Sequence, residues 1–337
     1  MDDNHFLIEW LAYHFYVMPM RRLIILVDPG SMTTPQPILD RWKDWIDVTV
    51  WHEEDIFPNG PPTPKNPKKN TTKLGQHRAR QRTFLMKCLQ QLHKERRGWV
   101  FVTDTDEYTM VNDLLRDPQK TAFFRQNVTL PEQSEPGSIM KLLKQGDAKH
   151  LVNGEYIHNM PCITMARRTF STKEMKNSSK TFLGYTKANF QTLHWKYYDK
   201  LFKPGKALVN LKKIRYRDIN SQPSVHRPIS NKTICTGKLA IIEQDSIFAV
   251  NHYPGNLHQM LFRKDDARGA ENNTAYRIQR FNDHKKIGRI HDTYRIEEWL
   301  KGFIAAFGEE KARQLLEHVG LPEQAAAAAA YTRISKQ

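Results

Sequence analysis

A cluster of carboxylates at residues 104–107 is the part of the sequence best suited to chemistry. Asp104, Asp106 and Glu107 directly follow the mostly apolar run 99–103. In an extended chain, the i, i+2 spacing places Asp104 and Asp106 on one side of a strand end. Carboxylate oxygens suit Mg²⁺ or Mn²⁺, which usually share their coordination shell with substrate phosphates. Alternatively the acids cap the next helix or pair with surface lysines. In either case a cation or several arginines must offset their repulsion.

Two further groups could contact an anionic ligand. Asp28 ends the apolar run 23–27 and precedes Pro-Gly-Ser, so it either contacts a ligand or caps that turn. His77, Arg78 and Arg82 begin a long helical segment, and an arginine there can bind a diphosphate through two parallel hydrogen bonds. We expect one of these three to do so and the others to lie on a solvated helix face.

The elements that position these residues follow from the apolar pattern. The short apolar runs 23–27, 46–51 and 99–103 predict buried strands. They alternate with predicted helices at residues 38–45 and 77–96, and a helix with one apolar face is predicted at residues 6–18. Residues 58–73 are expected to form a Pro-rich surface loop. This alternation predicts a doubly wound α/β sheet with ligands at the carboxyl ends of its strands.

The second half of the chain is less regular. Short strands are expected near 160–166, 207–209 and 247–250, and a helix near 296–317 closes the fold. The terminal segment 321–337 contains six consecutive alanines and is expected to be a helical or disordered tail. We find no internal repeat, P-loop, GxGxxG or known RNA-binding motif.

The charge is the unusual feature of the composition. The 337 residues are 39% hydrophobic and 26% charged, which is ordinary for a folded protein and excludes collagen-like, coiled-coil and wholly disordered classes. The net charge of +16 points to an anionic partner. Most of it lies in two blocks, 61–97 with 11 basic and one acidic residue, and 151–233 with 16 and 4. A nucleic-acid arm would more often be one basic tail.

Aromatic residues accompany the second basic block, among them Tyr185, Phe190 and Trp195, with Tyr197 and Tyr198 close by. They could stack on nucleic-acid bases, form a platform for sugar rings, or lie in the core beneath a solvated basic rim.

Cysteines and glycosylation sequons bear on the compartment. Cys88, Cys162 and Cys235 show no zinc-site spacing and allow one disulfide plus one free thiol. Five Asn-x-Ser/Thr sequons, at Asn70, Asn127, Asn177, Asn231 and Asn272, favour a secretory lumen. No apolar stretch is long enough to span a membrane and no signal region opens the sequence. The two interpretations are a cytosolic protein and a catalytic fragment without its anchor.

Several of these segments together resemble a known enzyme family. The segment 4–14, the run ending at Asp28, the segment 99–108 with its Asp-x-Asp-Glu-aromatic motif, and His252-Tyr253 look like family 92 and related family 2-type glycosyltransferases of the GT-A fold. The resemblance covers about residues 4–255, is strong in the first 110 residues and is patchy afterwards. It implies an α/β, Rossmann-like fold with a mixed central sheet flanked by helices and an elaborated C-terminal half. We expect one domain over 1–320, with a nucleotide-sugar-binding half (1–110) and an acceptor half (111–320).

The resemblance implies a metal-dependent transferase that moves a sugar from a UDP- or GDP-linked donor to a hydroxyl of a glycan or glycoprotein. Asp106 would ligate Mn²⁺ or Mg²⁺, and His252 would complete the metal shell. Asp104 would lie at the metal and the donor, and Asp28 by the donor nucleotide. An inverting enzyme also needs a carboxylate as general base. Glu174 and Asp266, with its neighbour Asp265, are the candidates.

The expected place of action is the Golgi lumen, where the chain would be a fragment of a type II membrane protein; the cytoplasm is the alternative. No nucleic acid is expected as a partner, and a membrane would be contacted only through an anchor outside this chain. The competing functional class is a non-enzymatic polyanion- or nucleic-acid-binding module, or a degenerate transferase.

Overall fold

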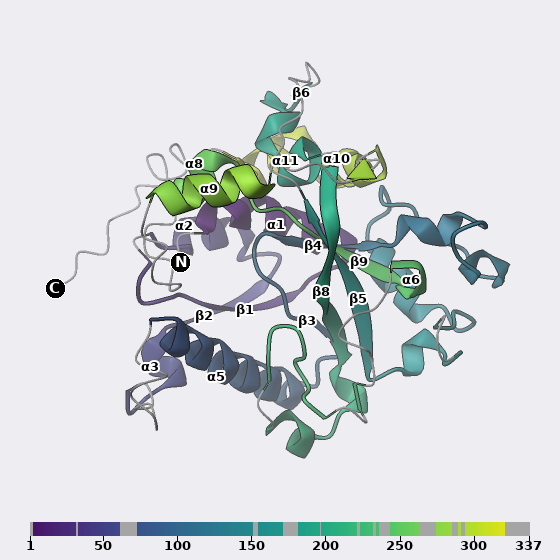
Figure 1. Cartoon of the computed structure of the whole chain (residues 1–337), viewed down its shortest axis with the longest axis horizontal. Coiled ribbons are helices and arrows are strands. Elements are labelled where there is room, and N and C mark those ends of the chain that lie inside the picture. Colours follow the sequence, from purple (N-terminus) through teal and green to yellow (C-terminus); the bar gives the residue numbers. More distant parts are fainter. Residues whose placement is uncertain are drawn as a thin grey trace.

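The protein is a mixed α/β structure in which helices flank a curled central sheet (Figure 1). It is represented by a computed structural model. The residues that it describes are 3–31, 33–60, 73–150, 154–170, 181–195, 197–220, 223–231, 234–235, 243–262, 274–284, 289–290 and 294–320. The expected α/β class with a mixed sheet and flanking helices is therefore confirmed.

The first half is built around two parallel strands. Strands β1 (Arg22–Leu26) and β2 (Asp47–Trp51) pair in register from Arg22 opposite Asp47 to Leu26 opposite Trp51. The helices that accompany them are α2 (Gln36–Leu39), α3 (Glu53–Ile56) and α5 (Lys73–Lys94). In Figure 1, α5 lies on one face of this pair, and α2 and the first helix, α1 (Asn4–Val17), lie on the other. The predicted strands and the long helix are thus present, whereas the predicted helix 38–45 is a short α2 followed by one 3-10 turn.

The large sheet contains six strands, β3 (Trp99–Phe101), β4 (Glu107–Val111), β5 (Cys162–Phe170), β8 (Tyr197–Asn210), β9 (Phe248–His252) and β10 (Arg289–Ile290). Their order is β10-β8-β5-β9-β4, and β3 pairs with another part of β8. Only β5 and β9 are parallel; the other pairs are antiparallel. The expectation that the strands of the first half belong to one doubly wound sheet is therefore wrong, because β1 and β2 form a separate pair and β3 pairs antiparallel with β8.

Helix α1 (Asn4–Val17) forms the centre of the core. Every residue from His5 to Val17 is buried, so the expectation of a helix with a single apolar face is wrong. The helix contacts β4, α2, α6 (Ser138–Lys144) and α10 (Tyr294–Phe307), which cover it on several sides. Tyr13 shows how it is held: its hydroxyl donates to the Thr109 carbonyl at 2.8 Å, and its ring meets that of Trp299 edge-on at 5.3 Å.

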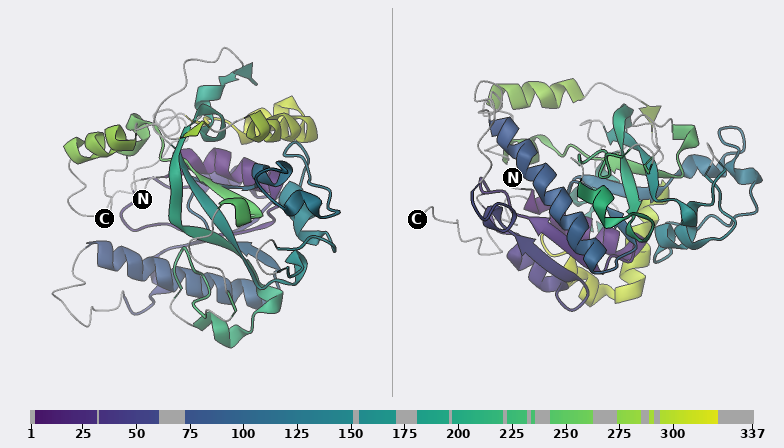
Figure 2. Two further views of the ribbon diagram at one scale, coloured as in Figure 1. Left: turned by 45° about the vertical axis from the view of Figure 1, so that its right-hand side comes forward. Right: turned by 90° about the horizontal axis from the view of Figure 1, so that it is seen from below.

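The remaining elements are distributed around the large sheet (Figure 2). The remaining α-helices among the described residues are α6 (Ser138–Lys144), α7 (Gln191–His194), α8 (Leu257–Phe262), α9 (Thr274–His284), α10 (Tyr294–Phe307) and α11 (Glu309–Leu315). A small hairpin joins β6 (Thr181–Phe182) to β7 (Tyr185–Thr186). Short 3-10 helices occupy Asp40–Trp42, Asp113–Arg116, Phe123–Arg125, Ile157–Asn159, Lys187–Asn189, Leu211–Lys213, Tyr216–Asn220 and Glu243–Asp245.

The helix expected over 296–317 is interrupted. Gly308 separates α10 from α11 with φ of 77°, a conformation that glycine adopts without steric cost.

In the part of the chain that the structure describes, no helix has the length and apolar character needed to cross a lipid bilayer. The alanine-rich segment 321–337 and residues 61–72 of the predicted loop lie outside the described residues.

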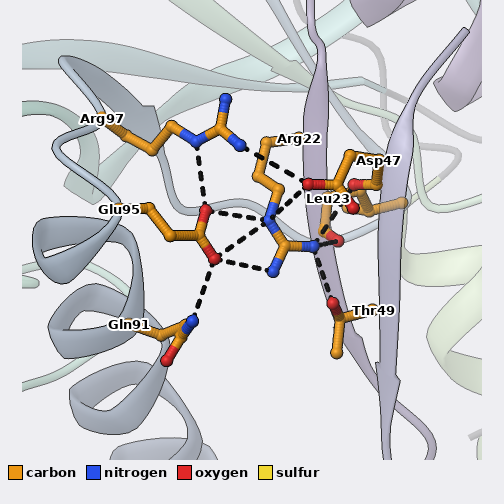
Figure 3. A network of polar contacts seen from close by, with 7 residues as sticks. All are labelled: Arg22, Leu23, Asp47, Thr49, Gln91, Glu95 and Arg97. Atoms are coloured by element: carbon orange, nitrogen blue, oxygen red, sulfur yellow. Dashed lines mark hydrogen bonds and ion pairs between the residues drawn. The ribbon is translucent and has the colours of Figure 1, made fainter.

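An ionic network ties the start of β1 to the end of α5 (Figure 3). The guanidinium of Arg22 binds Glu95 through two hydrogen bonds, at 2.9 and 3.0 Å, and also donates to Thr49. Arg97 donates to the same Glu95 carboxylate at 3.1 Å. The hydrogen bonds from Arg22 lower the pKa of Glu95 to about 2. This network fixes the end of the helix against the strand pair.

A disulfide joins Cys162 of β5 to Cys235, and Cys88 is the free thiol among the described residues. The one-pair arrangement that the cysteine count allowed is therefore present. The bond closes a loop with a sequence separation of 73 residues. Because such a link restricts the unfolded chain, it contributes about 4 kcal/mol in the loop-entropy description.

Reducing this bond is expected to lower the free energy of unfolding by about 4 kcal/mol. Denaturant unfolding with and without a phosphine reductant measures the change. The Cys235→Ala variant serves as the control, because the reductant has no bond left to break in it. A reductant effect of equal size in the variant would contradict the assignment.

Glu9 is an ionisable group inside the core. It is 1% exposed, and its carboxylate accepts hydrogen bonds from the backbone N–H of Gln191 at 2.5 Å and of Thr192 at 3.0 Å. The Thr192 hydroxyl donates to it at 2.6 Å. Burial raises the pKa of Glu9 to about 7 although these hydrogen bonds favour the ionised form. The side chain joins α1 to the start of α7.

The raised pKa makes stability depend on pH. Because folded Glu9 holds its proton more tightly than unfolded Glu9, its contribution is complete below pH 4.5 and is lost as the pH rises through about 7. We expect the free energy of unfolding of the wild type, minus that of Glu9→Gln, to fall by about 3 kcal/mol between pH 4.5 and 7.5. Chemical denaturation across this range measures the difference, and a constant difference would contradict the prediction.

Candidate functional site

The acidic segment forms a turn between β3 and β4. Asp106 belongs to the turn, and Glu107 is the first residue of β4. The extended geometry expected for residues 104–106 is therefore absent, and the two aspartates meet different partners. Asp104 contacts Lys206, whereas Asp106 contacts His252. The side chain of Asp104 is 47% exposed and that of Asp106 is 10% exposed.

Strand pairing brings Asp106 and His252 together. Glu107 of β4 lies opposite His252 of β9, and the N–H of Tyr253 donates to the Asp106 carbonyl at 2.9 Å. As a result, Asp106 Oδ2 is 3.5 Å from His252 Nε2. The two residues are distant in the sequence, and the structure places them side by side as a metal role requires. Their role in metal binding stays a prediction.

Lys206 and Arg167 compensate the other acids of the segment. Lys206 Nζ lies 3.1 Å from Asp104 Oδ2 and 2.8 Å from Glu107 Oε2. Arg167 Nε lies 2.7 Å from the second oxygen of Glu107. The ammonium of Lys206 is completely buried, and so is Glu107. These cations come from β8 and β5, and they supply the positive charge that the carboxylate cluster requires.

The charges of this cluster shift the pKa values of its members. Burial pushes the pKa of Lys206 down, but Asp104 and Glu107 outweigh this effect and hold it above the ordinary value. Burial likewise pushes the pKa of Asp104 up. The Lys206 ammonium outweighs it and keeps that pKa below its ordinary value, although Asp106 acts in the opposite direction. Both groups are therefore charged at neutral pH.

The donor set at Asp106 and His252 suits a divalent cation. A carboxylate oxygen and an imidazole nitrogen both bind Mn²⁺, and Mg²⁺ and Mn²⁺ accept carboxylate and water ligands. Among the described residues, however, no group of three His, Cys, Asp or Glu side chains is arranged to hold a metal. The pair could thus supply two ligands, and other positions of the shell would have to come from water or from a substrate.

Asp28 lies at a second polar centre, next to α5. Its carboxylate accepts the N–H of Gly30 at 2.9 Å, and its Oδ2 lies 3.6 Å from His77 Nδ1 and 3.5 Å from Arg80 Nη2. Burial raises the pKa of Asp28, but the adjacent His77 side chain, the hydrogen bond from the Gly30 N–H and the positive charge of Arg80 bring it well below its usual range. Asp28 therefore both stabilises its turn and contacts basic side chains.

Arg80 is the basic residue that sequence reasoning missed on α5. Arg78 and Arg82 lie on the exposed side of the helix, whereas His77 and Arg80 face a cavity. Residues three apart share a helix face, so the turn that contains His77 also presents Arg80. That periodicity is the signal that could have identified it.

A cavity of about 620 Å³ connects the two polar centres. Both Asp28 and Asp104 line it, together with His77 and Arg80, whereas Asp106 and His252 are not among its lining residues. Asp28 and Asp104 therefore share one cavity although they follow strands of different sheets. Its volume is in the range of small-molecule sites.

The remaining candidates fall in two groups. Glu174, Asp265 and Asp266, the candidate bases, lie outside the described residues. Of the aromatic residues near the second basic block, Phe190 and Trp195 are fully buried in the core, so neither can stack on a nucleic-acid base or a sugar.

The chain matches no known family model and no curated protein sequence.

Proposed function

We propose that this protein is a divalent-cation-dependent glycosyltransferase of the GT-A type, which transfers a sugar from a UDP- or GDP-linked donor to a hydroxyl of a glycan or glycoprotein. The observation that carries the proposal is the placement of the Asp104–Glu107 turn. Asp104 lines a cavity of about 620 Å³. Asp106, which lies two residues after Asp104 in the chain, has its Oδ2 3.5 Å from His252 Nε2. One short segment thus lies between a cavity and two side chains of types that can bind a divalent cation.

Asp106 and His252 would hold Mn²⁺ or Mg²⁺, and Asp104 would lie beside them towards the donor. Two protein ligands suit such ions, because these keep water and phosphate oxygens in their shell. A bound ion would neutralise the negative charge that develops on the leaving nucleotide.

The cavity residues would orient the donor. Asp28 can accept hydrogen bonds from the hydroxyls of a ribose, and Arg80 can bind a phosphate oxygen in exchange for its present partners, Asp28 and Glu53. Lys206 would hold Asp104 in place from behind. The reaction is proposed to invert the sugar configuration, with Glu174 or Asp266 removing the proton from the acceptor hydroxyl.

The Golgi lumen is the proposed compartment, with the membrane reached through an anchor outside this chain. The Cys162–Cys235 disulfide supports an oxidising environment. Asn127, one of the sequons, is exposed and thus accessible to glycosylation.

Thermal unfolding with nucleotide and metal tests the proposal. We expect UDP or GDP together with Mn²⁺ to raise the Tm, and the rise to disappear when EDTA removes the metal. A panel of nucleotide sugars then identifies the donor. If no nucleotide stabilises the protein with Mn²⁺ present, the proposal is wrong.

A degenerate transferase that binds polyanions without catalysis is the second candidate. It is favoured by the pairing of Asp104 with Lys206, which engages an aspartate that an active site would turn towards donor and metal. Single-stranded RNA in the same thermal experiment discriminates the two. Stabilisation by RNA that falls steeply with added salt, without any nucleotide effect, would favour this candidate.

A further inference from the structure

The structure joins the ends of the two basic blocks of the sequence. The first block ends just after α5, and the second contains the 3-10 helices η6 (Leu211–Lys213) and η7 (Tyr216–Asn220). Both 3-10 helices pack on α5, and near its C-terminal end the ring nitrogen Nε2 of His93 donates to the Ile214 carbonyl at 3.0 Å. Segments that are far apart in the sequence therefore form one surface at this end of the helix.

Five exposed basic side chains on this surface form no ion pair within the part of the chain that the structure describes. They are Lys94, Arg96, Lys212, Lys213 and Arg217, and we call them the cationic surface. The two other arginines of these segments bind the neighbouring acids. Arg215 binds Asp218 at 2.8 Å. Arg97 binds Glu95 at 3.1 Å (Figure 3). Because these arginines compensate the acids, the cationic surface keeps its net positive charge.

Arg96 has a backbone conformation that favours glycine. Its φ is 57°. Its N–H donates to the His93 carbonyl at 2.9 Å, and the following N–H donates to the Leu92 carbonyl at 3.0 Å. This pair of hydrogen bonds is the motif in which glycine commonly ends a helix, because a Cβ atom is unfavourable in the left-handed region. Since backbone N–H groups already satisfy these two carbonyls, their capping does not need the arginine side chain. The arginine thus adds a surface cation at a strained position.

Tyr216 presents an aromatic ring beside these cations. The residue is 39% exposed. Its ring meets that of His93 edge-on, with the two centroids 5.7 Å apart, and His93 is itself held by the Ile214 carbonyl. The ring is therefore supported from one side while part of it stays open to solvent. An exposed, supported aromatic ring offers an apolar surface and a hydroxyl group to a ligand.

This surface is distinct from the cavity. Neither Tyr216 nor any of the five cations lines that cavity. The five cations also differ from Arg167 and Lys206, which are buried against Glu107. Neither the proposed donor nor an acid inside the protein therefore accounts for their charge.

The arrangement suits a polyanion. One phosphate group engages one or two basic side chains, whereas five cations spread over two segments match a ligand whose charges are distributed along a chain. Nucleic acids and sulfated glycans both have such charges. The Cys162–Cys235 disulfide favours the glycan, because structural disulfides persist in oxidising compartments, where sulfated glycans occur and nucleic acids are scarce.

We propose that the cationic surface is a binding site for a sulfated glycan chain. The five basic side chains bind its sulfate groups, and Tyr216 packs against a sugar ring between them. The site lies outside the cavity, so it does not depend on the proposed transferase activity.

Heparin fragments test the site on the unmodified protein, without nucleotide or metal. Titration calorimetry compares a heparin octasaccharide with the same octasaccharide after chemical desulfation. We expect only the sulfated form to bind. The plot of log Kd against log salt concentration should have a slope of about 3.5, the value for five contacts that release counterions as on single-stranded nucleic acids. Equal binding of the desulfated form would overturn the proposal.

Two matched double variants locate the site. Lys212→Gln/Lys213→Gln should weaken heparin binding about 10- to 30-fold and lower the salt slope by about 1.4. Lys120→Gln/Lys301→Gln removes the same charge from exposed lysines on other segments and should bind as the wild type does. If both double variants lose affinity equally, net charge alone causes the binding and the proposal is wrong.

Arg96→Gly separates binding from folding. Because glycine adopts this φ without steric cost, the variant should keep or raise the Tm while its affinity for the octasaccharide falls about fivefold. An unchanged affinity would contradict the site as defined. Single-stranded RNA is the last comparison, and tighter binding of RNA than of the octasaccharide would overturn the glycan assignment. None of these outcomes bears on nucleotide binding, which the thermal experiment with Mn²⁺ measures separately.

Discussion

The Asp106→Asn variant is expected to lose Mn²⁺-dependent nucleotide binding and at least about 100-fold in kcat/KM for sugar transfer. The change removes one negative charge beside His252 and, under the proposed metal role, one strong oxygen ligand. Even residues that only orient a ligand typically contribute 10–100-fold to metal affinity, so loss of a ligand should cost more. Titration of Mn²⁺ in the presence of UDP, followed by calorimetry, measures the binding part directly.

Asp117→Asn is the matched control, since Asp117 makes a surface ion pair with Lys120 away from the turn. It should bind Mn²⁺ and nucleotide as the wild type does. The Tm of each variant without ligand separates loss of binding from loss of folding. Retention of full Mn²⁺-dependent nucleotide binding by Asp106→Asn would remove the metal role from this residue, and His252→Gln would then be expected to be silent too.

Local sequence patterns were sufficient for the elements of the first half. The runs 23–27, 46–51 and 99–103 are short and mostly apolar, and each overlaps a strand of the structure. The long helix after residue 73 was also predicted, although it begins four residues before the expected start at His77. These elements depend on interactions between residues close in the sequence, which a periodic pattern records.

Strand β4 could not be predicted in this way. It begins at Glu107, and all five of its residues are buried, so a charged residue opens a completely buried strand. That arrangement is stable only because Lys206 and Arg167, about 100 and 60 residues further along the chain, compensate the carboxylate. A sequence pattern does not show which basic residue reaches which acid.

Ion pairs between residues far apart in the sequence also explain why the basic block at 151–233 was interpreted differently from what the structure shows. From the sequence it was interpreted as a surface for an anionic partner or as part of an acceptor site. Arg167, Arg168 and Lys206 are instead buried and bind acids inside the protein. Part of the positive charge thus stabilises the fold, and this part is not available to bind nucleic acid. The pairing of Asp106 with His252 was anticipated through the resemblance, whereas the partner of Asp104 was not.

Lys206→Met is expected to lower the free energy of unfolding by about 3–5 kcal/mol, the largest effect on stability that we predict for one side chain. The substitution keeps the length and apolar stem of the lysine but removes the ammonium. Among the ion pairs of the described residues, the completely buried Glu107 would then keep Arg167 as its one cation, and Asp104 would have none. Removing one partner of a buried ion pair typically costs this much, because a charge is left uncompensated.

Two further variants give this prediction its controls. Lys212→Met changes an exposed lysine of the same chain region and should alter stability by less than about 0.5 kcal/mol. The double variant Lys206→Met/Glu107→Gln should recover part of the loss, because it removes the buried carboxylate together with its cation. If Lys206→Met unfolds at the denaturant concentration of the wild type, the buried cluster contributes little to stability.

The same variant also tests how the acids near the cavity are tuned. Because the Lys206 ammonium is what lowers the pKa of Asp104, its removal should raise that pKa, with Asp106 adding in the same direction. Carboxyl chemical shifts followed by NMR across pH 2–6 measure the change. A protein in which Asp104 titrates at a higher pH but Mn²⁺ binding persists would place the metal on Asp106 and His252 alone. Loss of Mn²⁺ binding together with the shift would assign Asp104 a direct part in holding the ion.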